Sequence, residues 1–128
     1  MSTFPSDLRY TSDHEWLRAE GANWRVGITQ FAVDQLGDIT LIDLPKEGDL
    51  ITKGQRFGTV ESVKSVSDLY APVSGKVISV NAALKDAPEL VNTAPYGEGW
   101  MIEIEATEQS ELSELLSADD YAAQVAAQ

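Results

Sequence analysis

Short runs of alternating apolar and polar residues, separated by turn-forming residues, limit the fold of this chain more than any other feature. In the run 100–105, the apolar side chains of Trp100, Ile102 and Ile104 alternate with Met101 and two glutamates. Alternation with a period of two is typical of a strand with one buried and one wet face. Similar short runs cover residues 24–28, 38–44, 56–62 and 75–80. The pattern predicts a mainly β protein.

Helical signals before the last third of the chain are brief. Thr29 is a suitable N-cap for a short helix that runs to Leu36 and is ended by Gly37. A single helical turn is expected over residues 88–92, where a proline begins the segment. Near the C-terminus, Ser117 is a suitable N-cap for an alanine-rich helix over residues 121–128. We therefore expect short peripheral helices and a helical C-terminus.

The charge of the chain is strongly negative and unevenly placed. Nine Lys and Arg against 21 Asp and Glu give a formal net charge of −12, which disfavours nucleic acid and membrane partners. Residues 86–128 contain acids but no Lys or Arg, and three leucines there have helical spacing. This segment is either a solvated helical face or, through Glu111 and Glu114, a docking surface for a cationic partner.

Several classes of intrinsic chemistry are excluded by composition. The 128 residues fit one domain, and they include no cysteine and only one histidine, His14. Disulfide scaffolds, Cys or Cys/His zinc sites and thiol nucleophiles are therefore absent, and His14 is expected to have a structural hydrogen-bonding role. The N-terminal residues lack the pattern of a signal peptide and no stretch has the length of a membrane span, so we expect a cytoplasmic protein.

A change of phase in the strand pattern points to one exposed lysine. Val60 belongs to the even set of apolar positions, whereas Val63 and Leu69 belong to the odd set. A phase change of this kind implies a bend or turn, which predicts a hairpin tip at residues 62–65 with Lys64 projecting from it. Small hydroxylated residues flank Lys64 and leave its amine accessible to acylation. A covalently anchored prosthetic group would supply the sulfur chemistry that a cysteine-free chain lacks.

At this point the sequence resembles a known family. Residues 61–75, ESVKSVSDLYAPVSG, are similar to the lipoyl-lysine hairpin of the glycine cleavage system H proteins. Segments 12–16 (SDHEW), 26–29 (VGIT), 89–92 (ELVN) and 95–100 (PYGEGW) resemble other blocks of the same family. The resemblance covers about residues 8–121, and the ordered set of blocks is far more specific than any one block.

The resemblance implies a fold and a cofactor. The implied fold is a barrel-sandwich hybrid, lipoyl/biotinyl-domain-like, of two small antiparallel sheets, and a weak internal duplication between residues 48–54 and 75–81 fits its pseudo-twofold symmetry. Residues 1–128 would form a single lipoyl-carrier domain, with an N-terminal extension over 1–21, a lipoyl-like core over about 22–105 and a C-terminal helical segment over 106–128. Lys64 corresponds to the lysine that bears lipoic acid in amide linkage.

The resemblance also implies a function, that of a carrier without catalytic activity of its own. An H protein takes an aminomethyl group from a pyridoxal-phosphate glycine decarboxylase to a tetrahydrofolate-dependent aminomethyltransferase. A dihydrolipoyl dehydrogenase that uses FAD and NAD then reoxidises the dithiol. Tethering raises the local concentration of the intermediate at each partner in turn. Lipoylating enzymes are further expected partners, and the protein is expected to be a monomer.

The family is thought to shelter its loaded arm in a surface cleft, away from water. The resemblance points to Glu15 and Asp68 as acids near this cleft, where a carboxylate would hold the cationic amine by a charge-assisted hydrogen bond. Both residues also have a simpler interpretation as ordinary surface acids.

Other functions stay open from the sequence. A related H-like protein would relay lipoyl groups to other acceptor proteins, and the sequence does not separate this role from glycine cleavage. A biotin carrier shares the fold, but its acceptor lysine usually lies between methionines, whereas Lys64 lies between Val63 and Ser65. A binding protein without a cofactor is a third alternative.

Overall fold

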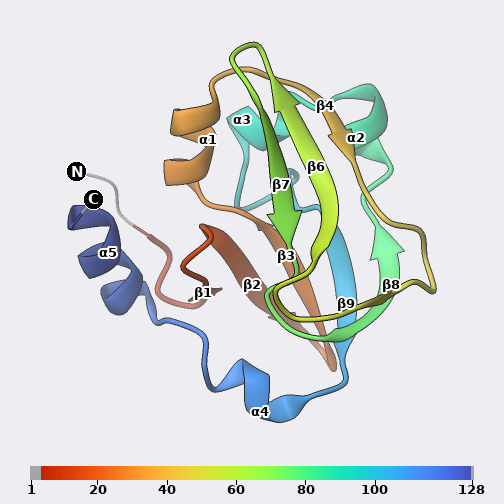
Figure 1. The fold of residues 1–128 in the computed structure, drawn as a ribbon, viewed down its shortest axis with the longest axis vertical. Helices are drawn as coiled ribbons and strands as arrows, with labels where there is room; N and C mark the ends of the chain where they lie inside the picture. The colour runs from red at the N-terminus through yellow and green to blue at the C-terminus, as the bar shows by residue number, and fades with distance from the viewer. Residues whose placement is uncertain (1–3, 128) are drawn as a thin grey trace.

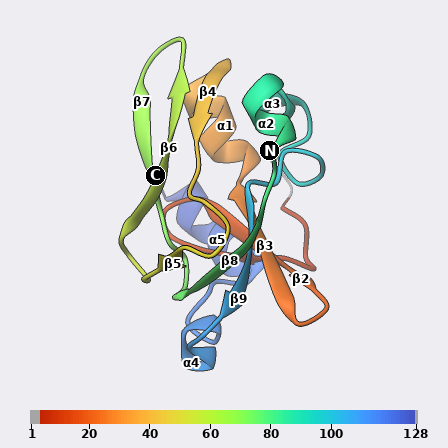
Figure 2. The same ribbon diagram turned by 90° about the vertical axis from the view of Figure 1, so that its right-hand side faces the viewer.

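Two antiparallel sheets form the body of the protein in the computed structural model, which describes residues 4–127 (Figures 1 and 2). The first sheet has six strands in the order β1-β2-β3-β9-β8-β5, and the second has three in the order β4-β6-β7. The strands of the first sheet, in that order, are Arg9–Tyr10, Glu15–Glu20, Asn23–Ile28, Ile102–Ala106, Gly75–Val80 and Leu50–Ile51. Those of the second are Ile39–Asp43, Arg56–Ser62 and Val66–Tyr70. The predicted mainly β fold with two antiparallel sheets is confirmed.

The main hydrophobic core lies between the two sheets. Strand β9 shows how the sequence pattern produces it, because Ile102 and Ile104 are fully buried while Glu103 is half-buried and Glu105 is exposed. From the second sheet, Val60 and Leu69 belong to the same buried cluster. Burial of these faces, at about 25 cal/mol for each Å² of apolar surface, is the main force that holds the two sheets together.

Three short helices lie beside the strands at the end of the molecule that carries the β6–β7 hairpin (Figure 1). Helix α1 spans Gln30–Leu36, with Thr29 as its N-cap and Gly37 at its C-terminal end, as the sequence predicts. Thr29 caps the helix through its side chain, because its hydroxyl oxygen accepts a hydrogen bond from the backbone N–H of Ala32. Helices α2 (Ala83–Asp86) and α3 (Leu90–Thr93) are single turns, and α3 overlaps the turn expected over residues 88–92.

The C-terminal segment is less helical than the leucine spacing suggests. Helix α4 spans only Gln109–Leu112, and α5 spans Ala118–Ala126 with the predicted Ser117 as its N-cap. Between them residues 113–115 form a turn and a bend, and Leu116 then exchanges two backbone hydrogen bonds with Tyr10 of β1 at 2.7 and 2.9 Å. This pairing places α5 beside the N-terminal strand.

A second, mainly aromatic cluster joins the N-terminal segment to α5. It contains Tyr10, Trp16 and Tyr121, all fully buried, together with Phe4 and Leu8. The rings of Tyr10 and Tyr121 are stacked, with centroids 4.8 Å apart and planes within 7°. The cluster fixes α5 against the six-stranded sheet. None of the helices within residues 4–127 is both long and apolar enough to cross a membrane.

Candidate functional site

The β6–β7 hairpin turns at residues 62–65, as predicted, and presents Lys64 at its tip (Figure 1). Ser62 closes the turn, because its backbone N–H donates to Ser65 O at 2.8 Å. The Ser62 hydroxyl oxygen also accepts from the backbone N–H groups of Lys64 and Ser65 at 3.2 and 3.1 Å. Such side-chain to backbone bonds replace the Asn-Gly pair that is common in tight turns. Lys64 is exposed, and no acidic group within residues 4–127 forms an ion pair with it.

The loop after α1 supports this tip from below. The backbone N–H of Val63 donates to Asp38 O at 3.0 Å, which ties the turn to the loop. The Asn92 amide holds the loop on its other side, donating to Gly37 O at 2.9 Å and accepting from the Ile39 N–H at 2.8 Å. The side chain of Lys64 passes over Gly37, and a β-carbon at position 37 would lie 3.0 Å from Lys64 Cε. Gly37 also has φ of +80°, a conformation that favours glycine.

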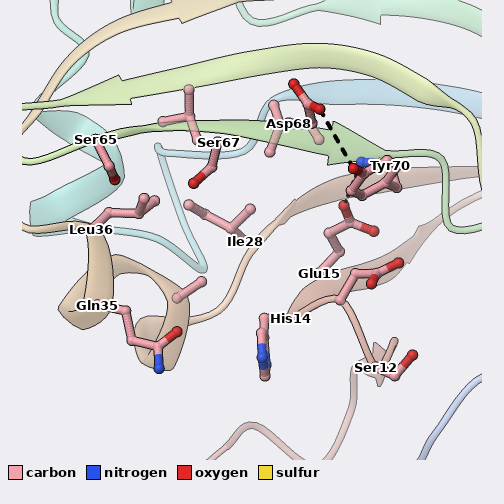
Figure 3. Close-up of a pocket in the computed structure, with 14 residues that line it drawn as sticks. Ser12, His14, Glu15, Ile28, Gln35, Leu36, Ser65, Ser67, Asp68 and Tyr70 are labelled. Atoms are coloured by element: carbon pink, nitrogen blue, oxygen red, sulfur yellow. Dashed lines mark hydrogen bonds between the residues drawn. The ribbon is translucent and has the colours of Figure 1, made fainter.

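A cleft of about 430 Å³ lies next to the hairpin, between α1, β7 and the start of β2 (Figure 3). Ser65 and Leu36 line the part of the cleft nearest the tip, and Ser12 and His14 line the far part. Its walls have an apolar portion and a polar portion. The apolar lining is Ile28, Leu36, Val60 and Leu69, and the polar lining includes Ser12, Asp13, Glu15, Ser67 and Asp68.

Glu15 is a buried acid in the wall of this cleft. It is only 2% exposed, and its carboxyl accepts hydrogen bonds from the Tyr70 backbone N–H at 2.9 Å and the Thr11 hydroxyl at 3.4 Å. Burial raises the pKa of Glu15 to about 8, against the lowering effect of these two hydrogen bonds. Near neutral pH the protonated form therefore predominates. A buried acid in a cleft, with a strongly shifted pKa, is typical of a functional site.

Asp68 lies in the same cleft but is more exposed. Its side chain accepts a long hydrogen bond of 3.5 Å from the Tyr70 hydroxyl and lies 3.8 Å from Arg56 Nη1. Tyr70 thus links the two acids, since its backbone N–H binds Glu15 and its hydroxyl contacts Asp68 (Figure 3). The structure brings together the two acids expected from the sequence, whereas Lys64 lies at the hairpin tip and does not itself line the cleft, although its neighbour Ser65 does.

His14 makes a hydrogen bond within the protein, as expected from the sequence. Its backbone has a left-handed conformation, which the sequence does not predict. Its φ is 69°, and it is the one non-glycine residue with positive φ among residues 4–127. This backbone costs on the order of 1 kcal/mol for a residue with a β-carbon. His14 Nδ1 lies 2.7 Å from the hydroxyl of Tyr121, which in turn lies 2.8 Å from Thr29 Oγ1. The sequence signal for Tyr121 is a single aromatic residue within an alanine-rich helix.

The two glutamates of the acidic C-terminal segment make contacts within the protein. Glu111 accepts from the Ser74 backbone N–H at 2.6 Å and from the Ser74 hydroxyl at 3.2 Å. Glu114 forms an ion pair with Lys53. Glu111 is thus engaged in holding the loop before β8, which favours a structural role for it. Within residues 4–127 no group of His, Asp or Glu side chains has the arrangement of a metal site.

Comparison with known proteins identifies the family. The family model for the glycine cleavage H-protein matches residues 8–128. The glycine cleavage system H protein of Listeria monocytogenes is 52% identical over 119 residues, covering 93% of this chain and 95% of that protein. That of Carboxydothermus hydrogenoformans is 54% identical over 121 residues, covering 94% and 93%. The crystal structure of a glycine cleavage system H protein from Mycobacterium marinum superposes with a TM-score of 0.88 at 42% identity, covering 96% of this chain and 99% of that one. The chain therefore belongs to the glycine cleavage H-protein family.

Proposed function

We propose that Lys64 is the lysine that carries the lipoyl group, and that the cleft of Glu15 and Asp68 shelters the loaded end of the arm. The chain is a non-catalytic lipoyl carrier of the glycine cleavage system. It works with glycine decarboxylase, aminomethyltransferase and dihydrolipoyl dehydrogenase, and its lipoate is attached covalently to a lysine. The observation that carries the proposal is the placement of an exposed lysine at a hairpin tip directly beside a cleft with a buried acid.

The surroundings of Lys64 suit a modified lysine. Its ammonium group has no ion-pair partner among the described residues, so acylation removes a charge without breaking a contact. Lys53, by contrast, pairs with Glu114. The Ser62 bonds and the contact between Val63 and Asp38 hold the backbone on either side of Lys64, so the attachment point of its exposed side chain is fixed.

The lining of the cleft fits the chemistry of a lipoyl arm. The apolar lining, which includes Leu36 and Val60, suits a hydrocarbon chain. Ser65 of the hairpin tip lines the same cleft, so the cleft begins next to the tip. When bound, the lipoyl group would supply a disulfide that is opened on accepting the aminomethyl group and is left as a dithiol when that group departs. Glu15 and Asp68 then offer carboxyl oxygens to a cationic amine.

The raised pKa of Glu15 couples cation binding to proton release. With no cation nearby, burial keeps the carboxyl mostly protonated near neutral pH. A cationic amine within hydrogen-bond distance favours the carboxylate, so binding of the cation lowers the pKa and expels one proton. The same walls limit the access of water to the amine, and this slows its hydrolytic loss.

Intact-mass measurement before and after substitution of Lys64 tests the attachment site. Protein lipoylated by its own enzymes should gain the mass of one lipoyl group, and Lys64→Arg should abolish the gain. Acylation converts a cationic ammonium group into a neutral amide, which makes the protein more negative, so the modified form should migrate faster on native gels. Lys76→Arg, at an exposed position of β8, is the matched control and should keep the added mass. A lipoyl group that persists in Lys64→Arg would contradict the proposal.

Two expectations from the sequence remain proposals. The cytoplasmic location is one, and fractionation of the source cells with detection of the lipoylated chain tests it. The division into an N-terminal extension, a core over about 22–105 and a C-terminal segment is the other. Proteolysis of the native protein at the proposed boundaries tests that division.

A further inference from the structure

We infer that Tyr121 of helix α5 is a positioning residue for the cleft, holding His14 in its left-handed conformation and thereby fixing the direction in which Glu15 points. This inference rests on the proposed sheltering role of Glu15. It concerns a side chain that does not line the cleft and that reaches it only through hydrogen bonds.

The hydroxyl of Tyr121 joins three elements of the fold. It lies 2.8 Å from Thr29 Oγ1 at the N-cap of α1 and 2.7 Å from His14 Nδ1 just before β2, while its own ring belongs to α5. Thr29 and Tyr121 are both fully buried. Water therefore does not replace these bonds when one partner is lost, and each bond matters more than it would at the surface.

The proton positions of this network follow from counting donors and acceptors. Thr29 is fully buried and its oxygen accepts from the Ala32 N–H at 3.3 Å, so among the described residues the Tyr121 oxygen is the acceptor available to its single hydroxyl proton. The Tyr121 proton then goes to His14 Nδ1, which leaves His14 protonated on Nε2. Burial lowers the pKa of His14, which favours the neutral ring that this arrangement needs. In this arrangement the hydroxyl protons of Thr29 and Tyr121 each make one hydrogen bond, the first to Tyr121 and the second to His14.

The held ring controls the backbone that leads into Glu15. The carbonyl oxygen of His14 accepts from the Thr29 N–H at 2.9 Å. The next residue, Glu15, is tied to Thr11 twice: its carbonyl oxygen accepts from the Thr11 N–H at 2.9 Å, and its own N–H donates to the Thr11 hydroxyl oxygen at 3.2 Å. The ring of His14 is also packed against Phe31, with centroids 4.7 Å apart. Helix α5 makes a second contact with this turn, because the Gln124 amide donates to Ser12 O at 3.3 Å. Left-handed backbone at His14 thus persists because partners from α1 and α5 fix it on both sides.

Tyr121→Phe is the direct test, because it removes the hydroxyl while keeping the ring that stacks on Tyr10. In the unmodified protein, ¹⁵N shifts of the single histidine ring report its tautomer. The wild type should show the Nε2–H form, and Tyr121→Phe should show a mixture of tautomers. In the loaded carrier, release of formaldehyde should be faster by about fivefold, the effect of one lost hydrogen bond.

Tyr10→Phe is the matched control. It makes the same change in the same aromatic cluster, but the Tyr10 hydroxyl donates to Pro5 O at 2.6 Å, away from the cleft. A merely structural role for Tyr121 would lower the melting temperature of both variants alike without changing release or tautomer in either. The positioning role predicts changes in these two readouts for Tyr121→Phe alone.

The outcomes separate this inference from the proposed function. Wild-type release and an unchanged tautomer in Tyr121→Phe, together with faster release in Glu15→Gln, would overturn the positioning role and leave the sheltering role standing. Wild-type release in Glu15→Gln would instead remove the sheltering role. The positioning role, which rests on it, would then fall as well, whichever tautomer of His14 is found in Tyr121→Phe.

Discussion

Gly37 lies against the aliphatic stem of Lys64, so that a β-carbon at position 37 would come within 3.0 Å of Lys64 Cε. The contact joins the C-terminal end of α1 to the tip of the β6–β7 hairpin. A residue 27 positions earlier in the sequence thus borders the space that the lysine stem occupies.

Gly37→Ala should therefore slow lipoylation of Lys64 by a purified lipoate ligase. The added methyl group displaces the lysine stem, and the positive φ also costs on the order of 1 kcal/mol of stability. Initial rates of lipoylation and melting temperatures measure the two effects separately. Gly54→Ala is the matched control, since Gly54 has a φ of +83° but nothing within 4 Å of an added β-carbon. Equal lipoylation rates in the two variants would show that the contact with Lys64 is unimportant.

Glu15→Gln should change how the stability of the protein depends on pH. The folded-state pKa of Glu15 is about 8, above its ordinary value of 4.5, so the proton bound by Glu15 stabilises the folded state fully below pH 4.5. This contribution is lost as the pH rises from 4.5 through 8, by an amount on the order of a few kcal/mol. Glutamine does not titrate, so the variant should lose less stability over this range.

Urea unfolding at several pH values between 5 and 8 measures this dependence. Glu105→Gln, at an exposed position, should keep the wild-type dependence. Parallel curves for Glu15→Gln and the wild type would mean that Glu15 has an ordinary pKa in the folded protein.

The two acids of the cleft should contribute unequally to protection of the loaded arm. Glu15 is buried, so its carboxylate binds a cationic amine with little competition from water, whereas Asp68 is exposed and lies near Arg56. Glu15→Gln should raise the rate of formaldehyde release by about tenfold, as expected for one lost charge-assisted hydrogen bond. Asp68→Asn should raise it by about twofold at most. Equal acceleration by the two substitutions would show that burial does not set their importance.

Asn92→Ala should destabilise the whole protein by about 2 to 3 kcal/mol. The substitution leaves the Gly37 carbonyl and the Ile39 N–H without their partner in a half-buried position. Denaturant unfolding gives the free energy. Asn23→Ala, which removes one side-chain bond to Glu103, should cost about 1 kcal/mol or less. A similar small loss for Asn92→Ala would mean that water replaces its amide.

Local sequence signals predict the elements whose ends are set by residues close in sequence. Thr29 and Gly37 bound α1 as predicted, because a cap and a positive-φ glycine act within a few residues. The phase change of the strand pattern predicts the turn that carries Lys64, although the Ser62 hydroxyl that closes this turn leaves no distinctive dipeptide in the sequence. Helix α4 ends earlier than the leucine spacing suggests because Leu116 pairs with Tyr10, far away in sequence.

The chemistry of the site depends on long-range contacts that a single sequence does not display. Resemblance to the family pointed to Glu15, but nothing in its local pattern indicates burial or its bond to Tyr70, 55 residues away. The contact between His14 and Tyr121 joins residues 107 positions apart. Both arise only when the second aromatic cluster brings α5 beside the start of β2.

Strand β7 is at the edge of its three-stranded sheet, and the Glu15 carboxyl already occupies the N–H of Tyr70 on that strand. An edge with unoccupied donors invites strand addition between molecules, which leads to aggregation. A carboxyl at this point blocks such cross-chain pairing beside the hairpin that must stay accessible. Glu15 thus covers one backbone donor of an edge strand in addition to lining the cleft.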